Sequence, residues 1–203
     1  MILYKGSVGA NSAIFDRIVL GTPTLACTEG ERARMQSKKN IFLIGFMGAG
    51  KSTVARYLHR QQGMNWLEMD KEIERKEGMP VSEIFRLRGE EYFRERETEL
   101  LLSLADKENT VVSCGGGVPL RACNVEAMKK SGIVVFLTAR PETILDRVKD
   151  SHERPLLEGH KDVEYISELL SRRMEKYEAA ADVLAATDGR TPEEIGKEIL
   201  KYL

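Results

Sequence analysis

The sequence has no long hydrophobic run, no surplus of either charge, and few cysteines or histidines. Its longest apolar stretch, around 41–50, is far shorter than the roughly 18 residues that indicate a membrane span. Its 31 Lys and Arg are matched by 32 Asp and Glu, for a net charge of −1, so no basic field attracts nucleic acid or anionic lipid. The composition therefore disfavours a membrane protein and a nucleic-acid-binding protein.

The three cysteines and three histidines fit neither a disulfide framework nor a zinc site. Cys27, Cys114 and Cys123 form an odd-numbered set without CxxC spacing, and no histidine pairs with them at ligand spacing. We expect free thiols in a reducing compartment, and hence a cytoplasmic protein. A chain of 203 residues buries enough surface to fold without a cross-link or a structural metal.

The chain divides into an N-terminal extension, residues 1–37, and a domain over 38–203. The extension mixes apolar and small residues without a helical or alternating period. It lacks the apolar core of a secretory signal and the acid-poor composition of a transit peptide. Two interpretations stay open: a partly ordered appendage, or an upstream extension of a reading frame that starts at Met35.

Short apolar segments and amphipathic segments alternate along the domain. The segments predicted as strands are 40–46, 65–69, 110–113, 133–137 and 182–186. The first predicted helix includes Val54 and Leu58 and ends at about residue 62. Further helices are predicted over 71–76, 81–88 (with Ser82 as N-cap), 90–106, 120–130, 141–149, 164–180 and 191–203. This alternation predicts an α/β fold with a mainly parallel five-stranded sheet covered on both faces. Ligands of such folds gather at the carboxyl ends of the strands.

The segment GFMGAGKS, residues 45–52, fits the pattern GxxxxGK[ST] and lies between a predicted strand and a predicted helix. Its backbone N–H groups can cradle phosphate oxygens, and the dipole of the following helix adds positive potential. Lys51 is expected to reach the β- and γ-phosphates, and the Ser52 hydroxyl to bind Mg²⁺. The predicted ATP-binding residues here are Gly48, Ala49, Gly50, Lys51, Ser52 and Thr53. The fold is then a three-layer α/β/α domain of the P-loop NTPase type.

The base-reading NKxD and switch DxxG strings of GTPases are absent from the sequence. The chain is also too short for a motor or a large ATPase. A compact kinase that acts on a small molecule fits best.

Charged residues and glycines near the strand ends indicate an acceptor site. Because strand side chains alternate, Glu68 and Asp70 are predicted to share a face aimed at the phosphate loop. Glu97 follows Arg94 by three residues on a predicted helix, which brings the two side chains together. The three glycines at 115–117 allow a ligand to approach the backbone closely.

These strings together resemble the shikimate kinase family, from about Asn40 to the C-terminus. The motifs that carry the resemblance are GFMGAGKS, the strand-end Asp70, FRxxE over 93–97, GGG over 115–117, RPLL over 154–157, and Arg172 or Arg173 followed by Tyr177. The similarity to gluconate kinases weakens after the phosphate loop. The resemblance implies phosphorylation of the 3-hydroxyl of shikimate by ATP with Mg²⁺.

The resemblance also implies roles for residues of the acceptor site, within a substrate-binding region of about 70–107. Arg94 and Arg173 correspond to the pair that clamps the shikimate carboxylate, and Glu97 would orient Arg94. Asp70 would bind the ring hydroxyls and is the candidate general base. Gly115, Gly116 and Gly117 would offer backbone N–H groups to the substrate.

Further ATP contacts are implied on the other side of the site. The polar segment 151–162 corresponds to a mobile lid, and its Arg154 would neutralise charge on the transferring phosphoryl group. Arg147 falls where the family stacks an arginine on adenine, and Arg190 and Pro192 fall on the opposite side of that ring.

One residue departs from the family pattern. Glu68 stands where an aspartate is common, two residues before Asp70. The resemblance implies that this carboxylate acts near Mg²⁺, often through water, and the extra methylene shifts its geometry.

Two alternatives to shikimate phosphorylation stay open. The chain could be a kinase of another small hydroxy acid, or a non-catalytic, shikimate-kinase-like binding or regulatory protein. The presence of Lys51, Asp70 and both clamp arginines argues against the second. We expect a monomer that binds ATP and shikimate, and neither nucleic acid nor a membrane.

Overall fold

The computed structural model of the protein describes residues 40–149 and 162–203. The N-terminal extension and the predicted lid up to residue 161, with Arg154, lie outside the described residues.

Five parallel strands form one sheet in the order β2-β3-β1-β4-β5. They are β1 (Asn40–Ile44), β2 (Asn65–Glu68), β3 (Thr110–Ser113), β4 (Gly132–Thr138) and β5 (Val183–Ala186). The central strand β1 is buried along its whole length, and Ile41 pairs with Val111 on one side and Ile133 on the other. The predicted parallel α/β sheet is confirmed.

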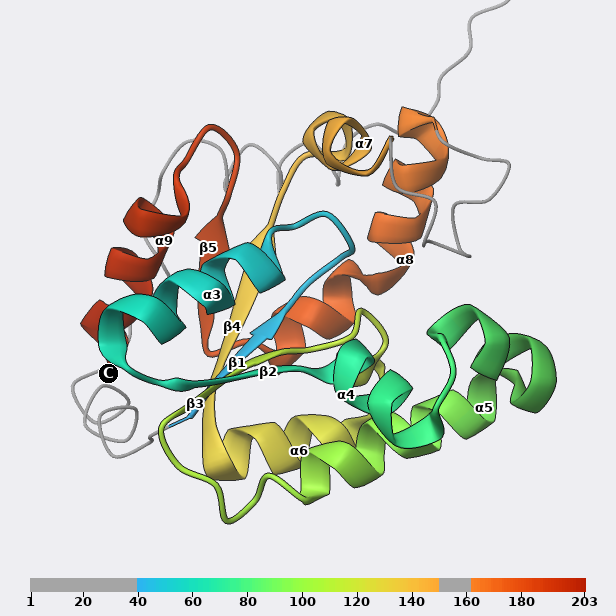
Figure 1. Cartoon of the computed structure of the whole chain (residues 1–203). Helices are drawn as coiled ribbons and strands as arrows, with labels where there is room; N and C mark the ends of the chain where they lie inside the picture. Colours follow the sequence, from blue (N-terminus) through green and yellow to red (C-terminus); the bar gives the residue numbers. More distant parts are fainter. Residues whose placement is uncertain (1–39, 150–161) are drawn as a thin grey trace, which may run out of the picture.

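Helices cover both faces of the sheet (Figure 1). One face packs on α3 (Lys51–Gln62) and α9 (Pro192–Ile199), and the other on α4 (Met69–Glu77), α5 (Val81–Leu102), α6 (Ala122–Ser131), α7 (Pro141–Val148) and α8 (Val163–Ala180). Short 3-10 turns follow at Val118–Leu120 and Leu200–Tyr202. Alternate β1 residues enter the two cores, Leu43 on the α3 side and Phe42 on the α5 side. This alternation is what makes three layers.

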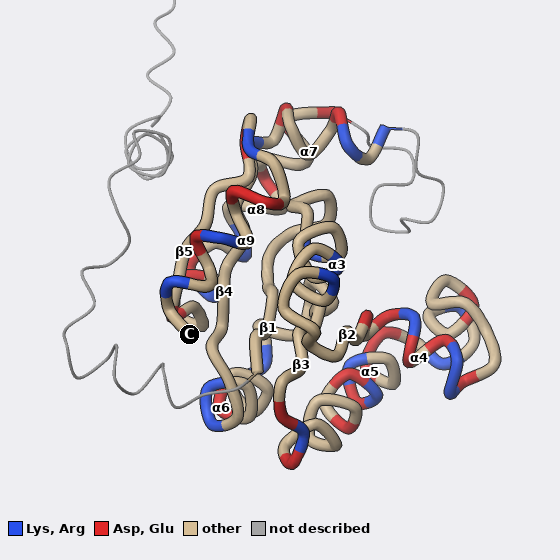
Figure 2. Tube along the Cα trace, turned by 60° about the vertical axis from the view of Figure 1, so that its left-hand side comes forward, with Lys and Arg blue, Asp and Glu red and all other residues tan. Residues whose placement is uncertain are grey.

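Helix α4 and the first half of α5 project from the body beside the sheet (Figure 2). The sequence predicted a break near residue 89, and α5 is kinked there, with Gly89 at φ 83° and ψ 168°. The predicted N-cap at Ser82 is wrong. Pro80 occupies that position, and the backbone N–H of Val81 donates instead to Oε1 of Glu74, 3.0 Å away.

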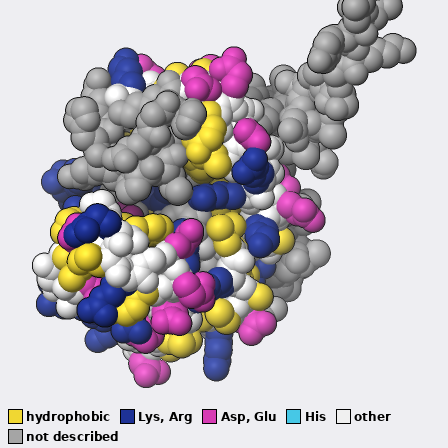
Figure 3. Space-filling model, turned by 90° about the vertical axis from the view of Figure 1, so that its right-hand side faces the viewer, with side chains coloured by type: hydrophobic (Ala, Val, Ile, Leu, Met, Phe, Trp, Pro, Cys, Tyr) yellow, Lys and Arg dark blue, Asp and Glu magenta, His cyan; other side chains and the backbone are white. Residues whose placement is uncertain are grey.

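The surface carries no extended field of one sign on the face seen in Figure 3, where basic and acidic side chains are interspersed. Within 40–149 and 162–203, no helix is long and apolar enough to cross a membrane.

Candidate functional site

A cleft of about 1730 Å³ opens at the carboxyl ends of the strands. It is lined by sixteen of the residues that the sequence singled out: Gly48, Gly50, Lys51, Ser52, Thr53, Glu68, Asp70, Arg94, Glu97, Gly115, Gly116, Gly117, Arg147, Arg173, Arg190 and Pro192. Ala49, also predicted to bind ATP, does not line the cleft, because its side chain is buried in the core with residues of α3. Residues distant in sequence therefore meet in one place.

The phosphate loop takes a conformation that requires glycine. Gly48 and Gly50 have φ of 75° and 98°, which side chains disfavour. A Cβ on Gly48 would lie 2.9 Å from Cγ1 of Val148. The loop leads into α3, whose first residue is Lys51, so free backbone N–H groups and the positive helix end face the cleft.

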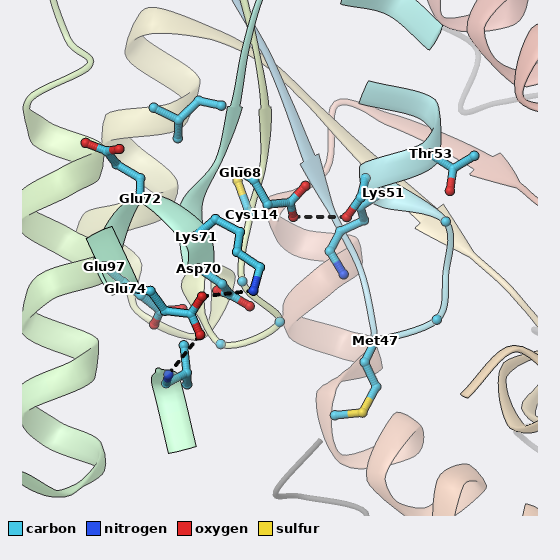
Figure 4. Close-up of a pocket in the computed structure, with 18 of the residues that line it drawn as sticks. Met47, Lys51, Thr53, Glu68, Asp70, Lys71, Glu72, Glu74, Glu97 and Cys114 are labelled. Carbon is cyan, nitrogen blue, oxygen red and sulfur yellow. Dashed lines mark hydrogen bonds and ion pairs between the residues drawn. The ribbon is translucent and has the colours of Figure 1, made fainter. Parts of the chain in front are cut away.

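Lys51 folds back over this loop. Its Nζ donates hydrogen bonds to the carbonyl oxygens of Gly45 and Phe46, at 2.8 and 2.9 Å. Figure 4 shows Lys51 and Glu68 on neighbouring walls of the cavity. The ammonium group is thus held at the mouth of the anion cradle.

Glu68, the last residue of β2, is bonded to two serine hydroxyls. Its Oε1 accepts from Oγ of Ser52 at 3.0 Å and from Oγ of Ser113 at 2.6 Å. Its Oε2 is buried and has no hydrogen-bond partner among the described residues. The carboxylate therefore bridges the phosphate loop and the end of β3.

Asp70 does not extend β2, as the sequence had predicted. Strand β2 ends at Glu68, and Met69, fully buried, begins α4, so Asp70 lies in the first helical turn. The shared strand face inferred from alternation is therefore wrong. Both carboxylates nevertheless line the cleft, because the helix starts at its edge (Figure 4).

Arg94 is fixed on several sides. Its guanidinium donates to Glu97 and to Glu90, each at 2.7 Å, and lies 5.9 and 5.6 Å from the ring centres of Phe85 and Phe93. Only 12% of its side chain is exposed. The predicted Arg94–Glu97 pair is confirmed.

Glu97 is completely buried on α5. Burial raises the pKa of its carboxyl group from 4.5 to about 7, although the ion pair with Arg94 opposes the rise, and the negative charge of Asp70 adds to it. Its Oε1 has no hydrogen-bond partner within the described segments of the chain. The site thus holds a carboxyl group that titrates near neutral pH.

In the glycine loop after β3, Gly115 and Gly117 have no room for side chains. A Cβ on Gly117 would lie 2.1 Å from Nη1 of Arg94, and one on Gly115 would lie 2.3 Å from Oε1 of Glu97. The loop therefore packs directly against the Arg94–Glu97 pair.

Arg173, rather than its neighbour Arg172, reaches the cleft from α8. Its guanidinium carbon lies 5.7 Å from the ring centre of Phe46, whereas exposed Arg172 pairs with Glu168 at 2.5 Å. The buried Tyr177 donates its hydroxyl hydrogen to the carbonyl oxygen of Gly116 at 2.7 Å. The tyrosine thus anchors the glycine loop to α8.

Two arginines lie at the other end of the cleft. Arg147 donates to the carbonyl oxygen of Gly48 and to both oxygens of Thr187, each at 3.0 Å. Arg190 donates to the carbonyl oxygen of Ala186 at 3.1 Å and to Glu198 at 2.5 Å. Both are preordered around the end of β5.

Sequence reasoning missed the roles of Ser113, Thr187 and Phe85 in ordering the site. Ser113 ends a strand and Thr187 directly follows one. A polar residue at the carboxyl end of a parallel strand is a sequence signal that could have identified both. Phe85 carries no such signal, because it reaches Arg94 only through the fold of α4 and α5.

Comparison of the sequence with families of known proteins identifies similar chains. The family model described as shikimate kinase matches residues 47–203. A shikimate kinase from Thermodesulfovibrio yellowstonii is 42% identical over 163 residues, 80% of this chain and 94% of that protein. One from Sulfurihydrogenibium sp. is 43% identical over 162 residues, 80% of this chain and 96% of that protein.

The fold is also similar to solved structures of shikimate kinases. Shikimate kinase from Acinetobacter baumannii in complex with shikimate superposes with a TM-score of 0.77 at 36% identity, covering 84% of this chain and 95% of that one. Shikimate kinase from Aquifex aeolicus gives a TM-score of 0.69 at 40% identity, over 80% and 95%.

Proposed function

The chain belongs to the shikimate kinase family, and we propose that it transfers the γ-phosphoryl group of ATP to the 3-hydroxyl of shikimate. The products are shikimate 3-phosphate and ADP, on the pathway to chorismate and the aromatic amino acids. The enzyme is thus a phosphotransferase with an alcohol acceptor.

The observation that carries the proposal is the convergence of Arg94 and Arg173 on the glycine loop beside Asp70, in the cleft that Lys51 also lines. Two guanidinium groups suit a planar carboxylate. A carboxylate next to them suits ring hydroxyls. Shikimate has one carboxylate and three hydroxyls, so its chemistry matches this lining.

We assign the phosphoryl-transfer chemistry to a few residues. Lys51 stabilises negative charge on the β- and γ-phosphates, and the N–H groups of 48–53 hold them. Asp70 orients the attacking hydroxyl and accepts its proton. The loose transition state asks little of a base, so orientation is the larger component of this role. Arg154, outside the described residues, is assigned to the lid.

The adenine ring is assigned to the end of the cleft lined by Arg147, Arg190 and Pro192. The hydrogen bonds of Arg147 to Gly48 and Thr187 hold its guanidinium plane in place before the nucleotide arrives. Preordering of this kind reduces the entropy lost on binding.

The residues near the phosphate loop fit a divalent cation. Mg²⁺ prefers oxygen ligands and usually combines one or two protein groups with waters and phosphates. Ser52 and Glu68 supply such oxygens, and Oε2 of Glu68 is buried without a hydrogen-bond partner among the described residues. No cluster of three or more acidic, His or Cys side chains in the described ranges could hold a metal ion. When bound, Mg²⁺ neutralises phosphate charge.

We propose further that the protein acts as a monomer in the cytoplasm. The thiols of Cys114 and Cys123 are free, as in reducing compartments, which supports the proposed location.

The clamp assignment is tested by comparing two adjacent arginines in steady-state assays. Arg173→Met should raise the KM for shikimate about 100-fold, because charge-assisted hydrogen bonds contribute about 1.5–3 kcal/mol each. Arg172→Met is the matched control and should leave the KM within about twofold, since Arg172 is exposed, pairs with Glu168 and does not line the cleft. Equal KM values for the two variants would contradict the clamp.

A further inference from the structure

The side chain of Glu68 has one more rotatable bond than that of an aspartate, and hydrogen bonds from neighbouring serine side chains restrain it. Ser113, the last residue of β3, is only 1% exposed. Its hydroxyl lies 2.6 Å from Oε1 of Glu68 and 3.5 Å from the hydroxyl of Ser52. The three side chains form one polar cluster joining β2, β3 and α3.

The two carboxylate oxygens of Glu68 differ in their hydrogen bonding within this cluster. Oε1 accepts from both serine hydroxyls, whereas Oε2 is buried and has no hydrogen-bond partner among the described residues. A buried carboxylate oxygen without a donor is costly. A bound cation would satisfy it, and the two hydrogen bonds on Oε1 determine which oxygen stays available.

We propose that Ser113 is a positioning residue that holds the Glu68 carboxylate in place for the divalent cation of the bound nucleotide. This inference rests on the proposed function, because the cation enters with ATP. Ser113 acts through Glu68 and does not itself bind the cation.

The physical reason lies in side-chain entropy. Because of its extra rotatable bond, a glutamate side chain loses more conformational entropy than an aspartate side chain when it is ordered. The Ser113 hydrogen bond orders it before the cation arrives. Groups that orient a metal ligand in this way typically change metal affinity by about 10–100-fold when they are removed.

The experiment measures binding of Mn²⁺, a spectroscopic substitute for Mg²⁺, to the full chain saturated with ADP, by electron paramagnetic resonance. Ser113→Ala should weaken Mn²⁺ binding about 10–100-fold and leave ADP affinity in EDTA unchanged. Ser113→Cys, which keeps the same branching but donates only weakly, should show the same loss. Ser131→Ala is the control, since that hydroxyl donates to Ala127 before β4, at the opposite end of the sheet.

A double-mutant cycle then separates positioning from any other role. In a Glu68→Gln background, Ser113→Ala should produce no further loss of Mn²⁺ affinity, because the group that it positions is gone. An equal further loss would overturn the inference, as would unchanged Mn²⁺ affinity in Ser113→Ala and Ser113→Cys.

The same measurements distinguish this inference from the proposed function. Tight Mn²⁺ binding by both the original chain and the Ser113 variants would overturn only the role of Ser113. If the original chain with ADP bound no Mn²⁺ and formed no shikimate phosphate, both proposals would fail.

Discussion

Replacement of the buried Glu97 by glutamine should remove a pH dependence from the stability of the protein. The carboxyl group has a pKa of about 7 in the folded chain against 4.5 ordinarily, mainly because burial disfavours its charge. Between these values the folded state holds a proton that the unfolded state has released, so stability falls as pH rises from about 4.5 through 7.

The size of this effect follows from the displacement of the pKa. At about 1.36 kcal/mol per pKa unit, a rise from 4.5 to about 7 corresponds to about 3 kcal/mol. Glu97→Gln resembles the protonated carboxyl group at every pH. The stability of the variant relative to the original chain should therefore increase by about 3 kcal/mol between pH 4.5 and pH 7.5. The attraction between Arg94 and the charged carboxylate is already included in this figure, because it opposes part of the rise in the pKa.

Urea unfolding followed by circular dichroism at several pH values measures this difference. Glu95→Gln, on the exposed side of the same helix, is the control and should follow the original chain at every pH. A Glu97→Gln difference that does not change with pH, or an equal change in Glu95→Gln, would refute the reasoning.

The remaining predictions concern activity. Lys51→Met should lower kcat at least about 100-fold, as loss of a transition-state charge partner does, with an unchanged circular dichroism spectrum; substantial residual turnover would contradict the cradle. Asp70→Asn should lower kcat far more than it alters ATP affinity by calorimetry, and equal effects would contradict an acceptor-side role. Gly117→Ala should raise the KM for shikimate at least about tenfold, because its Cβ would meet the Arg94 guanidinium at 2.1 Å; an unchanged KM in steady-state assays would show that the pair can shift freely.

Local patterns in the sequence were sufficient for the sheet and the phosphate loop. The strand 110–113 was predicted with the bounds it has, because a short β-branched run lies shortly before the three glycines at 115–117. The break at Gly89 was also correct. The Arg94–Glu97 pair was predictable because helical spacing of three residues places the two side chains together.

Local sequence patterns could not predict contacts between segments that are distant in the sequence. Asp70 was placed on a strand because alternation cannot indicate that a buried Met69 starts a helix. The bond between Glu68 and Ser113 joins residues 45 positions apart, and the raised pKa of Glu97 arises from complete burial. Both depend on the packing of β2, β3 and α5, which no local spacing specifies.

The most direct test of the account is a mass-resolved assay of the purified chain with ATP, Mg²⁺ and shikimate, and with gluconate as the control acceptor. We expect a shikimate monophosphate with one ADP per product and no phosphorylated gluconate. Binding of ATP without a shikimate product would contradict the proposed reaction and favour another acceptor or a non-catalytic role.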